Sequence, residues 1–214
     1  LKEQEQKLAE MTALQLQINP HFLFNTLQTL DFKALEYTRM PTALNRIIEA
    51  LSDILKYSLQ NTMSMVTLKD EIEYLKKYDH IQQYRYEDKY ILYYDYEEEL
   101  ESTPIIRLIL QPLIENSLYH GIKPLDGSGF IKLKITERDN WLTVTVIDTG
   151  VGMEKAEITA LYEKINHPGN ENIGLANVNS RLVMQYGEES RLKILSKKHM
   201  GTCISFRIPF SQSL

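Results

Sequence analysis

The sequence predicts an α+β protein in which a helical hairpin precedes a mixed α/β sandwich. Two observations support this prediction. Apolar residues recur at steps of three to four positions through residues 2–59, which is the helical period. From residue 90 onward, segments rich in β-forming residues alternate with helix-patterned segments. The chain has 214 residues, of which 43% are hydrophobic, and can bury a core of this kind.

Charge and cysteine content narrow the functional class. The formal net charge of -5 argues against a nucleic-acid partner, because no basic excess is available to neutralise phosphates. The single cysteine, Cys203, excludes an internal disulfide and fits a reducing compartment. No apolar run approaches the ~20 residues of a membrane span. The chain starts without Met, so we expect a fragment of a longer protein.

The first predicted helix covers residues 2–38, which contain no Gly and only one Pro, Pro20. Its apolar stripe consists of Leu8, Met11, Leu14, Ile18, Phe22, Leu23, Leu27, Leu30 and Ala34. Pro20 should kink the helix, because proline removes a backbone donor and clashes with the preceding turn.

A second helix is expected after Thr42, which can cap it, and its apolar stripe runs to Leu59. One hairpin cannot cover both of its faces, so a second copy is the economical partner. Residues 1–66 are therefore predicted to form a dimeric four-helix bundle.

The remaining residues, 67–214, are expected to form the sandwich, with a leading helix over 67–89 and helices on one face of the sheet. Before it, Asn61–Val66 is expected to be a loop. The expected strands are Tyr90–Tyr96, Phe130–Thr136, Trp141–Asp148, Arg191–Lys197 and Thr202–Pro209. The further expected helices are Ile105–His120, opened by Pro104, then Glu154–Ile165 and Ile173–Gln185, while Glu97–Thr103 is expected to be an acidic loop.

Three short segments of the second half have the chemistry of an anion or nucleotide site. On the first segment, Asn116 and His120 are four residues apart and share a helix face. The amide oxygen of Asn116 can ligate Mg²⁺. The imidazole of His120 or the nearby Lys123 can bind phosphate oxygens. The second places Asp148 at a strand end, where a carboxylate can accept from an exocyclic amine. Two glycines that let backbone approach a ligand follow, namely Gly150 and Gly152. The third is Gly174 at a helix start, which presents unpaired N–H groups to an anion.

His21 is the most informative single residue, because it interrupts an apolar helical stretch. An imidazole there can be a nucleophile, a metal ligand or a buried hydrogen-bonding group. The five histidines show no metal-ligand spacing. Without other evidence, a buried, hydrogen-bonded histidine is the default interpretation. A site in the same chain that could supply a phosphoryl group favours the nucleophile instead.

These motifs resemble a known family. Asn116, Asp148-x-Gly150-x-Gly152 and Gly174-Leu175 are similar to the N, G1 and G2 boxes of the ATP-binding fold shared by gyrase, Hsp-type chaperones, histidine kinases and mismatch-repair ATPases (the GHKL, or Bergerat, fold). Residues 112–121, Pro-Leu-Ile-Glu-Asn-Ser-Leu-Tyr-His-Gly, resemble LytS/YesM-like sensor histidine kinases. The stretch 17–27 around His21 resembles the phosphoacceptor box of that class, and the resemblance covers nearly the whole chain.

The resemblance implies an ATP- and Mg²⁺-dependent kinase that phosphorylates His21 and passes the phosphoryl group to an aspartate of a response regulator receiver domain. Asp148 would bind the adenine amine and Asn116 the Mg²⁺. His120 and Lys123 would lie near the phosphates, under a mobile lid over 153–172. The residues that would close the site are Gly174, Leu175 and Asn177.

Two departures from the related patterns concern the catalytic base. Pro112 stands where gyrase-type ATPases carry a glutamate that activates water, so transfer to His21 should be favoured over hydrolysis. Phe22 stands where many histidine kinases carry an acidic residue after the phosphoacceptor. Asn25, one turn on, is a candidate for orienting His21, and Glu115 is a candidate base.

The resemblance further implies a homodimer that forms the cytoplasmic domain of a bacterial plasma-membrane protein, attached only through segments upstream of this chain. Two alternatives remain open. One is a serine kinase or ATPase on the same fold, which would have no use for the histidine box. The other is a catalytically inactive dimeric scaffold.

Overall fold

The computed structural model of the chain describes residues 20–166 and 174–210. The chain divides into two compact units, Leu1–Gln60 and Asn61–Leu214. The predicted boundary after Val66 differs from this division, because the segment from Asn61 onward groups with the second unit. Most of the predicted first helix before Pro20, and with it the predicted kink, lies outside the described residues.

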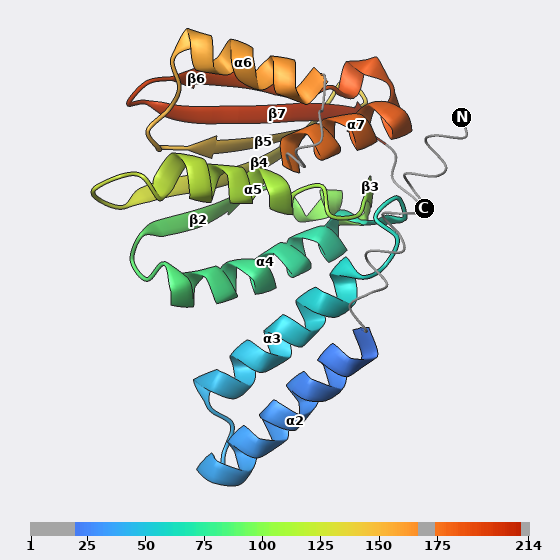
Figure 1. Ribbon diagram of the computed structural model, residues 1–214. Helices are drawn as coiled ribbons and strands as arrows, with labels where there is room; N and C mark the ends of the chain where they lie inside the picture. The colour runs from blue at the N-terminus through green and yellow to red at the C-terminus, as the bar shows by residue number, and fades with distance from the viewer. Residues whose placement is uncertain (1–19, 167–173, 211–214) are drawn as a thin grey trace. The chain divides into compact units, whose positions relative to one another are not determined.

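The first unit is a helical hairpin of α2 (Pro20–Thr38) and α3 (Ala43–Ser58), as predicted (Figure 1). Thr42 caps α3: its backbone N–H donates to the side-chain oxygen of Asn45 at 3.0 Å. The buried Asn45 amide also donates to the Asp31 carboxylate of α2 at 2.7 Å. This contact joins the two helices and gives a buried polar group its partners.

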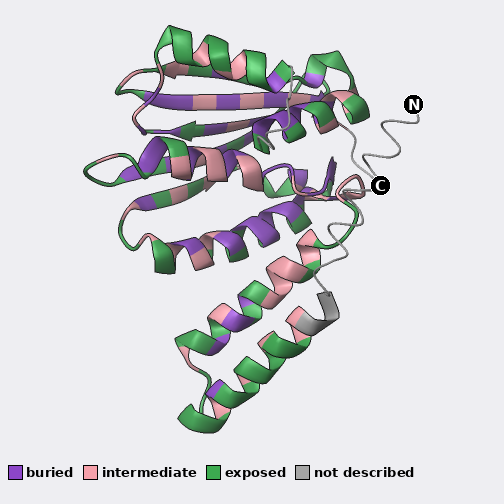
Figure 2. Ribbon diagram, in the orientation of Figure 1, coloured by how far each residue is buried: buried purple, intermediate pink, exposed green. Residues whose placement is uncertain are grey.

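Much of the apolar surface of the hairpin is exposed, whereas α4 and the central strands of the second unit each bury one face (Figure 2). Phe32 is 77% exposed and Tyr37 is 85% exposed. The other large apolar side chains exposed on these helices are Leu30, Leu44 and Leu51, and Leu59, directly after α3, is exposed as well. A single copy of the hairpin therefore leaves an apolar face uncovered.

The second unit is the predicted α/β sandwich. Its strands are β1 (Met65–Thr67), β2 (Tyr90–Asp95), β3 (Pro104–Ile106), β4 (Gly129–Arg138), β5 (Trp141–Asp148), β6 (Lys193–Lys197) and β7 (Gly201–Pro209). Its helices are α4 (Leu68–Arg85), η1 (Glu98–Ser102), α5 (Gln111–Asn116), η2 (Ser117–Ile122), α6 (Lys155–Asn166), α7 (Gly174–Tyr186) and η3 (Glu188–Ser190).

Five strands form one sheet in the order β2-β4-β5-β7-β6, with β2 parallel to β4 and the other neighbours antiparallel. Burial alternates along β4, β5 and β7, so one face of the sheet is covered and the other is accessible. The residues that fill the covered face include Ile131, Leu133, Val144, Val146, Ile204 and Phe206.

Two sequence predictions near the start of this unit are wrong. The predicted loop before residue 67 contains β1, which pairs antiparallel with β3. Pro104 opens that strand instead of a helix, and α5 begins seven residues later at Gln111. A three-residue strand is too short to show an alternating pattern, and the apolar run from Ile105 fits a buried strand as well as a helix.

The helix that starts at Gln111 changes its geometry partway. After Asn116 it continues as the π-helix η2, and the backbone N–H of Lys123 donates to the carbonyl of Leu118, five residues back, at 2.8 Å. Such wide turns are rare and occur frequently at functional sites. Within the described residues, no helix combines the length and apolar character that spanning a bilayer requires.

Candidate functional site

The second unit contains a cavity of about 620 Å³, within the size range of small-molecule sites. Its walls come from α5 and η2, the end of β5 and the loop after it, α6, the start of α7 and the β6–β7 turn. The lining residues are Pro112, Glu115, Asn116, Tyr119, His120, Gly121, Asp148, Val151, Gly152, Met153, Glu157, Leu161, Lys164, Gly174, Leu175, Lys198 and Thr202.

Asp148, the last residue of β5, is 2% exposed. Its Oδ1 accepts from the backbone N–H groups of Gly150 at 2.8 Å and Thr202 at 3.2 Å. Its Oδ2 is buried and has no hydrogen-bond partner in the described part of the chain. A buried carboxylate oxygen without a partner can still accept a hydrogen bond. The exocyclic amine of a bound base would supply the donor.

Burial raises the pKa of the Asp148 carboxyl above its ordinary value. The two backbone N–H groups and the nearby hydroxyl of Ser117 oppose that shift. The Ser117 hydroxyl lies close enough to Asp148 to affect its pKa. It is itself buried and makes no hydrogen bond of normal distance and angle to a described residue.

The glycines after Asp148 allow close backbone contacts around the cavity. A Cβ on Gly150 would lie 2.4 Å from the backbone of Gly121 in η2. Gly152 has φ +61° and a Cβ there would lie 2.0 Å from the carbonyl oxygen of Lys197. Of these two glycines, Gly152 lines the cavity, and Gly150 is buried against Gly121 without lining it.

The wall formed by α5 and η2 carries Glu115 and Asn116 at the end of α5, followed by His120 in η2. A side-chain relay fixes Glu115. The Tyr74 hydroxyl of α4 donates to Gln111 Oε1 at 2.6 Å, and Gln111 Nε2 donates to Glu115 Oε1 at 2.9 Å. The candidate base is therefore held on the cavity wall by groups outside the cavity.

The other predicted site residues of this unit divide between cavity and surface. Gly174 and Leu175 at the start of α7 line the cavity. Asn177 is exposed and Lys123 lies beside the ring of Tyr119, 5.9 Å from Nζ to the centroid; neither is among the lining residues.

Sequence reasoning missed two lysines on the cavity wall. Lys164 comes from the end of α6 and Lys198 from the β6–β7 turn, where it pairs with Glu157 at 3.7 Å. Both are cations that can meet anionic groups of a ligand. No local pattern distinguishes them from ordinary surface lysines, so only the tertiary arrangement identifies them.

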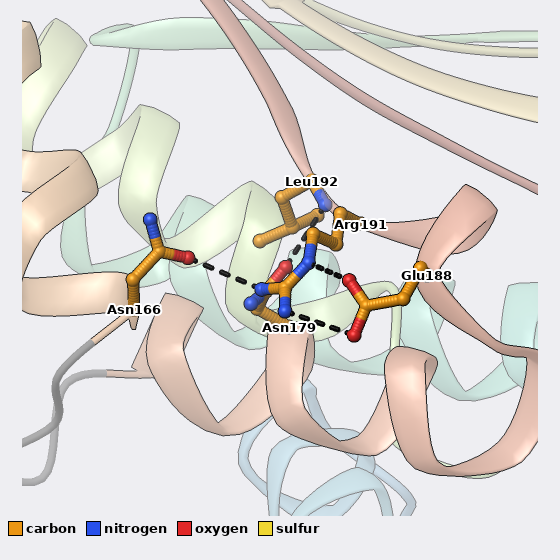
Figure 3. A network of polar contacts seen from close by, with 5 residues as sticks. All are labelled: Asn166, Asn179, Glu188, Arg191 and Leu192. Carbon is orange, nitrogen blue, oxygen red and sulfur yellow. Dashed lines mark hydrogen bonds and ion pairs between the residues drawn. The ribbon is translucent and has the colours of Figure 1, made fainter.

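A polar network connects described residues that flank the segment 167–173 (Figure 3). That segment, which includes the end of the predicted lid, lies outside the described residues. Arg191 donates to the side-chain oxygen of Asn166 at 3.2 Å and pairs with Glu188. Asn179 of α7 accepts from the backbone N–H of Leu192 at 3.0 Å. These contacts tie the end of α6, α7 and the start of β6 together.

In the first unit, His21 lies near the start of α2, and its side chain is outside the described residues. Asn25 lies four residues later on the same helix and is exposed. Residues four apart on a helix are neighbours, so the predicted pair has the required spacing.

Comparisons with known proteins agree with this arrangement. Residues 9–90 match the family described as Histidine kinase, and residues 102–212 match the family described as Histidine kinase-, DNA gyrase B-, and HSP90-like ATPase. The chain is similar to the Sensor protein kinase HptS of Staphylococcus aureus (strain bovine RF122 / ET3-1), with 33% identity over 207 residues. The alignment covers 95% of this chain and 39% of that protein. HptS of strain USA300 matches to the same extent.

Two solved structures share the fold. The histidine kinase domain of the Erythrobacter litoralis EL346 blue-light activated histidine kinase aligns with a TM-score of 0.50 and 18% identity, over 99% of this chain and 94% of that one. The Acinetobacter baumannii histidine kinase AdeS aligns with a TM-score of 0.50 and 14% identity, over 90% and 96% of the two chains. These structures confirm the predicted fold, and the family match over residues 102–212 identifies an ATPase domain. The chain belongs to the histidine kinase-, DNA gyrase B- and HSP90-like ATPase family, and its N-terminal part matches the Histidine kinase family.

Proposed function

We propose that this chain transfers the γ-phosphoryl group of ATP to His21 and then to an aspartate of a response regulator receiver domain. The observation that carries the proposal is the buried, unpartnered Asp148 Oδ2 in a cavity of nucleotide size. The histidine-containing region of the same chain matches a histidine kinase family. The chain spans 39% of its sensor kinase relative, and we propose that it is the cytoplasmic catalytic part of such a bacterial membrane protein.

The cavity residues divide into two groups in this proposal. Asp148 accepts from the adenine amine, and a nucleotide therefore completes its hydrogen bonding. On the other wall, Asn116 is the proposed Mg²⁺ ligand. The groups proposed to surround the phosphates are His120, Lys123, Lys164, Lys198 and the α7 start with Gly174, Leu175 and Asn177. When bound, Mg²⁺ neutralises phosphate charge and so favours the developing transition state.

The transfer step forms a bond between an imidazole nitrogen of His21 and the γ-phosphorus. The bond from that phosphorus to the β,γ-bridging oxygen breaks, and ADP leaves with the electron pair. His21 must be neutral to attack, which is accessible near pH 7. The proton on its other ring nitrogen needs an acceptor or an orienting partner, and the candidates are Asn25 on the same helix and Glu115 on the cavity wall.

The exposed apolar face of the hairpin supports a homodimer. Leu44 and Leu51 are seven residues apart on α3, and Leu30 and Tyr37 are seven apart on α2. Heptad spacing of exposed apolar residues is typical of helices that pack against a partner helix. We propose that a second copy covers this face to form the four-helix bundle.

The decisive test of the function is incubation with labelled ATP and Mg²⁺, followed by mapping of the modified residue. We expect an acid-labile, base-stable label on His21. His21→Gln should abolish the label and keep nucleotide affinity, whereas His80→Gln, on the exposed surface of α4, should keep both. An acid-stable label would support the serine kinase alternative, and nucleotide binding without any label would support the scaffold.

Sedimentation of the chain at tens of micromolar tests the dimer separately. We expect a dimer for the native sequence and a monomer for Leu51→Glu, because a buried unpaired charge at a helix seam is costly. Lys56→Glu, also exposed on α3, is the matched control and should remain dimeric. A monomeric native chain would contradict the bundle.

A further inference from the structure

The turn that leads from β3 into α5 has a backbone conformation that leucine rarely adopts. Leu108 has φ +53°, in the left-handed region where a bulky side chain is unfavourable. Such a conformation persists only when surrounding contacts hold it in place. Two charged side chains supply those contacts, one from a residue before the turn in the sequence and one from a residue after it.

Glu71 of α4 binds the amide side of this turn. Its carboxylate is 1% exposed and accepts from the backbone N–H groups of Leu108 at 2.6 Å, Ile109 at 3.0 Å and Leu110 at 3.3 Å. These groups lie immediately before α5, where helix geometry leaves N–H groups without intrahelical partners. A carboxylate there also interacts favourably with the helix dipole.

Arg181 of α7 binds the carbonyl side of the same turn. Its guanidinium donates to the carbonyl of Leu108 at 3.1 Å and also to the carbonyls of Arg107 and Thr62. Burial lowers the pKa of Arg181, and the Glu71 carboxylate opposes that shift, as expected for charges that interact. We call the two side chains the turn clamp.

The turn clamp joins the elements that form the walls of the cavity. α5 carries Glu115 and Asn116 on one wall, and α7, which carries Arg181, begins at Gly174 on another. Neither clamp residue lines the cavity. The clamp can therefore affect a bound ligand only indirectly, through the placement of α5 and α7.

We propose that Glu71 and Arg181 are positioning residues for phosphoryl transfer, because they fix the first turn of α5 and thereby place Glu115 and Asn116 beside the phosphates. This inference rests on the proposed kinase function. Asp148 lies on β5 and keeps its backbone hydrogen bonds without the clamp. Loss of the clamp should therefore affect the rate of transfer more than the affinity for the adenine end of a nucleotide.

The test compares Glu71→Gln and Arg181→Met with the controls Glu73→Gln and Arg138→Met, which alter exposed residues elsewhere. For each variant of the chain, kcat and KM for phosphate incorporation and the Kd for ADP are measured. We expect kcat to fall about 100-fold in the clamp variants, since small misplacements of reacting groups have effects of that order. KM and the Kd for ADP should change little, and the controls should match the native chain.

Two further variants distinguish positioning from general loss of structure. Arg181→Lys keeps the charge but not the planar fork that reaches three carbonyls, so its kcat should be intermediate. Leu108→Gly relieves the left-handed backbone, so in the Glu71→Gln background it should restore part of the lost kcat. Native kcat in the clamp variants, or equal losses of kcat and ADP affinity, would overturn the proposal.

Amide hydrogen exchange tests the clamp without any activity. In Glu71→Gln, the amides of Leu108, Ile109 and Leu110 should exchange faster than in the native chain, while amides in β5 should not change. Unchanged exchange at the three amides would overturn the clamp. A native chain that incorporates no phosphate would defeat the proposed function, whereas the exchange result would still decide whether the clamp exists.

Discussion

The two ends of the cavity are held in place by different kinds of contact. Around Asp148, the loop after β5, η2 and the β6–β7 turn meet through backbone atoms, and no side chain fits at Gly150 or Gly152. Around α5, by contrast, side chains from α4 and α7 hold the backbone, as Glu71 and Arg181 do. Backbone contacts cannot shift without loss of the fold, whereas side-chain contacts can be weakened stepwise. In the proposed kinase, the rigid end would bind the base and the adjustable end would position the groups that take part in phosphoryl transfer.

Gly150→Ala should have the largest effect, because it breaks the rigid end. Its Cβ would lie 2.4 Å from the backbone of Gly121, so one of the two segments has to move. Overpacking of this kind typically costs about 1–3 kcal/mol and sometimes more. Thermal unfolding should show lower stability, and calorimetry should show loss of nucleotide binding.

Gly127→Ala is the matched control, since nothing lies within 4 Å of the position of its Cβ. It should leave both stability and binding at the native level. Equal effects of the two substitutions would contradict the assignment of Gly150 to a close backbone contact.

Asp148→Asn should have the next largest effect and should change specificity as well as affinity. The asparagine oxygen can keep the bonds to Gly150 and Thr202, which leaves an amide donor where the buried Oδ2 stood. Loss of a hydrogen bond to a charged group costs about 1.5–3 kcal/mol, or roughly 10- to 100-fold in ATP affinity. ITP, which carries an oxygen in place of the amine, should lose less affinity or gain some. Equal losses for both nucleotides would place the base contact elsewhere.

The same carboxyl should give the stability of the fold a characteristic pH dependence. Burial raises the pKa of this carboxyl above 3.8 in the folded chain. At pH values between 3.8 and the pKa of the folded chain, the folded state therefore binds more protons than the unfolded state. The free energy of unfolding should therefore fall as pH rises through that window, and Asp148→Asn should remove this contribution.

Denaturation without nucleotide over a pH series measures this slope. Asp95 is the informative control, because Lys132 lowers its pKa and its contribution to stability grows with pH instead. Asp95→Asn should therefore alter the slope in the opposite sense. The same slope in the native chain and in Asp148→Asn would contradict the assigned shift.

Tyr74→Phe should have the smallest effect, because it loosens one step of the relay at the adjustable end. It removes the hydroxyl that donates to Gln111, which in turn binds Glu115. One neutral hydrogen bond contributes about 1 kcal/mol, so we expect about a fivefold lower kcat for phosphate incorporation. ADP affinity should not change, and Tyr84→Phe, on the exposed side of α4, should change neither quantity. An unchanged kcat would show that the hydrogen bonds from Tyr74 through Gln111 do not position Glu115 for the reaction.

The sequence predicted features that repeat or that follow one another in the chain. α3 was predictable from its period and its cap, α4 from its period, and the β4–β5 hairpin from its β-forming residues. The motif residues that line the cavity were predictable because their pattern is local, as with Asp148 and Gly152. Glu71 reaches amides 37 to 39 residues away, so no window of sequence shows that contact. The late start of α5 was missed for a local reason, because the apolar run from Ile105 fits a buried strand as well as a helix.

The π-helical turn of η2 has a consequence for how this segment can vary. A π-turn holds one more residue than an α-turn, so it is equivalent to a one-residue insertion within a helix. Removal of one residue between Asn116 and Gly121 would therefore convert the wide turn into an α-turn and leave the orientation of the residues after it nearly unchanged. Gly121, whose missing side chain leaves room for Asp148 Oδ1 at 2.8 Å from the position of its Cβ, would still face that carboxylate. The wide turn thus lets this segment hold an additional residue while Gly121 keeps its place against Asp148.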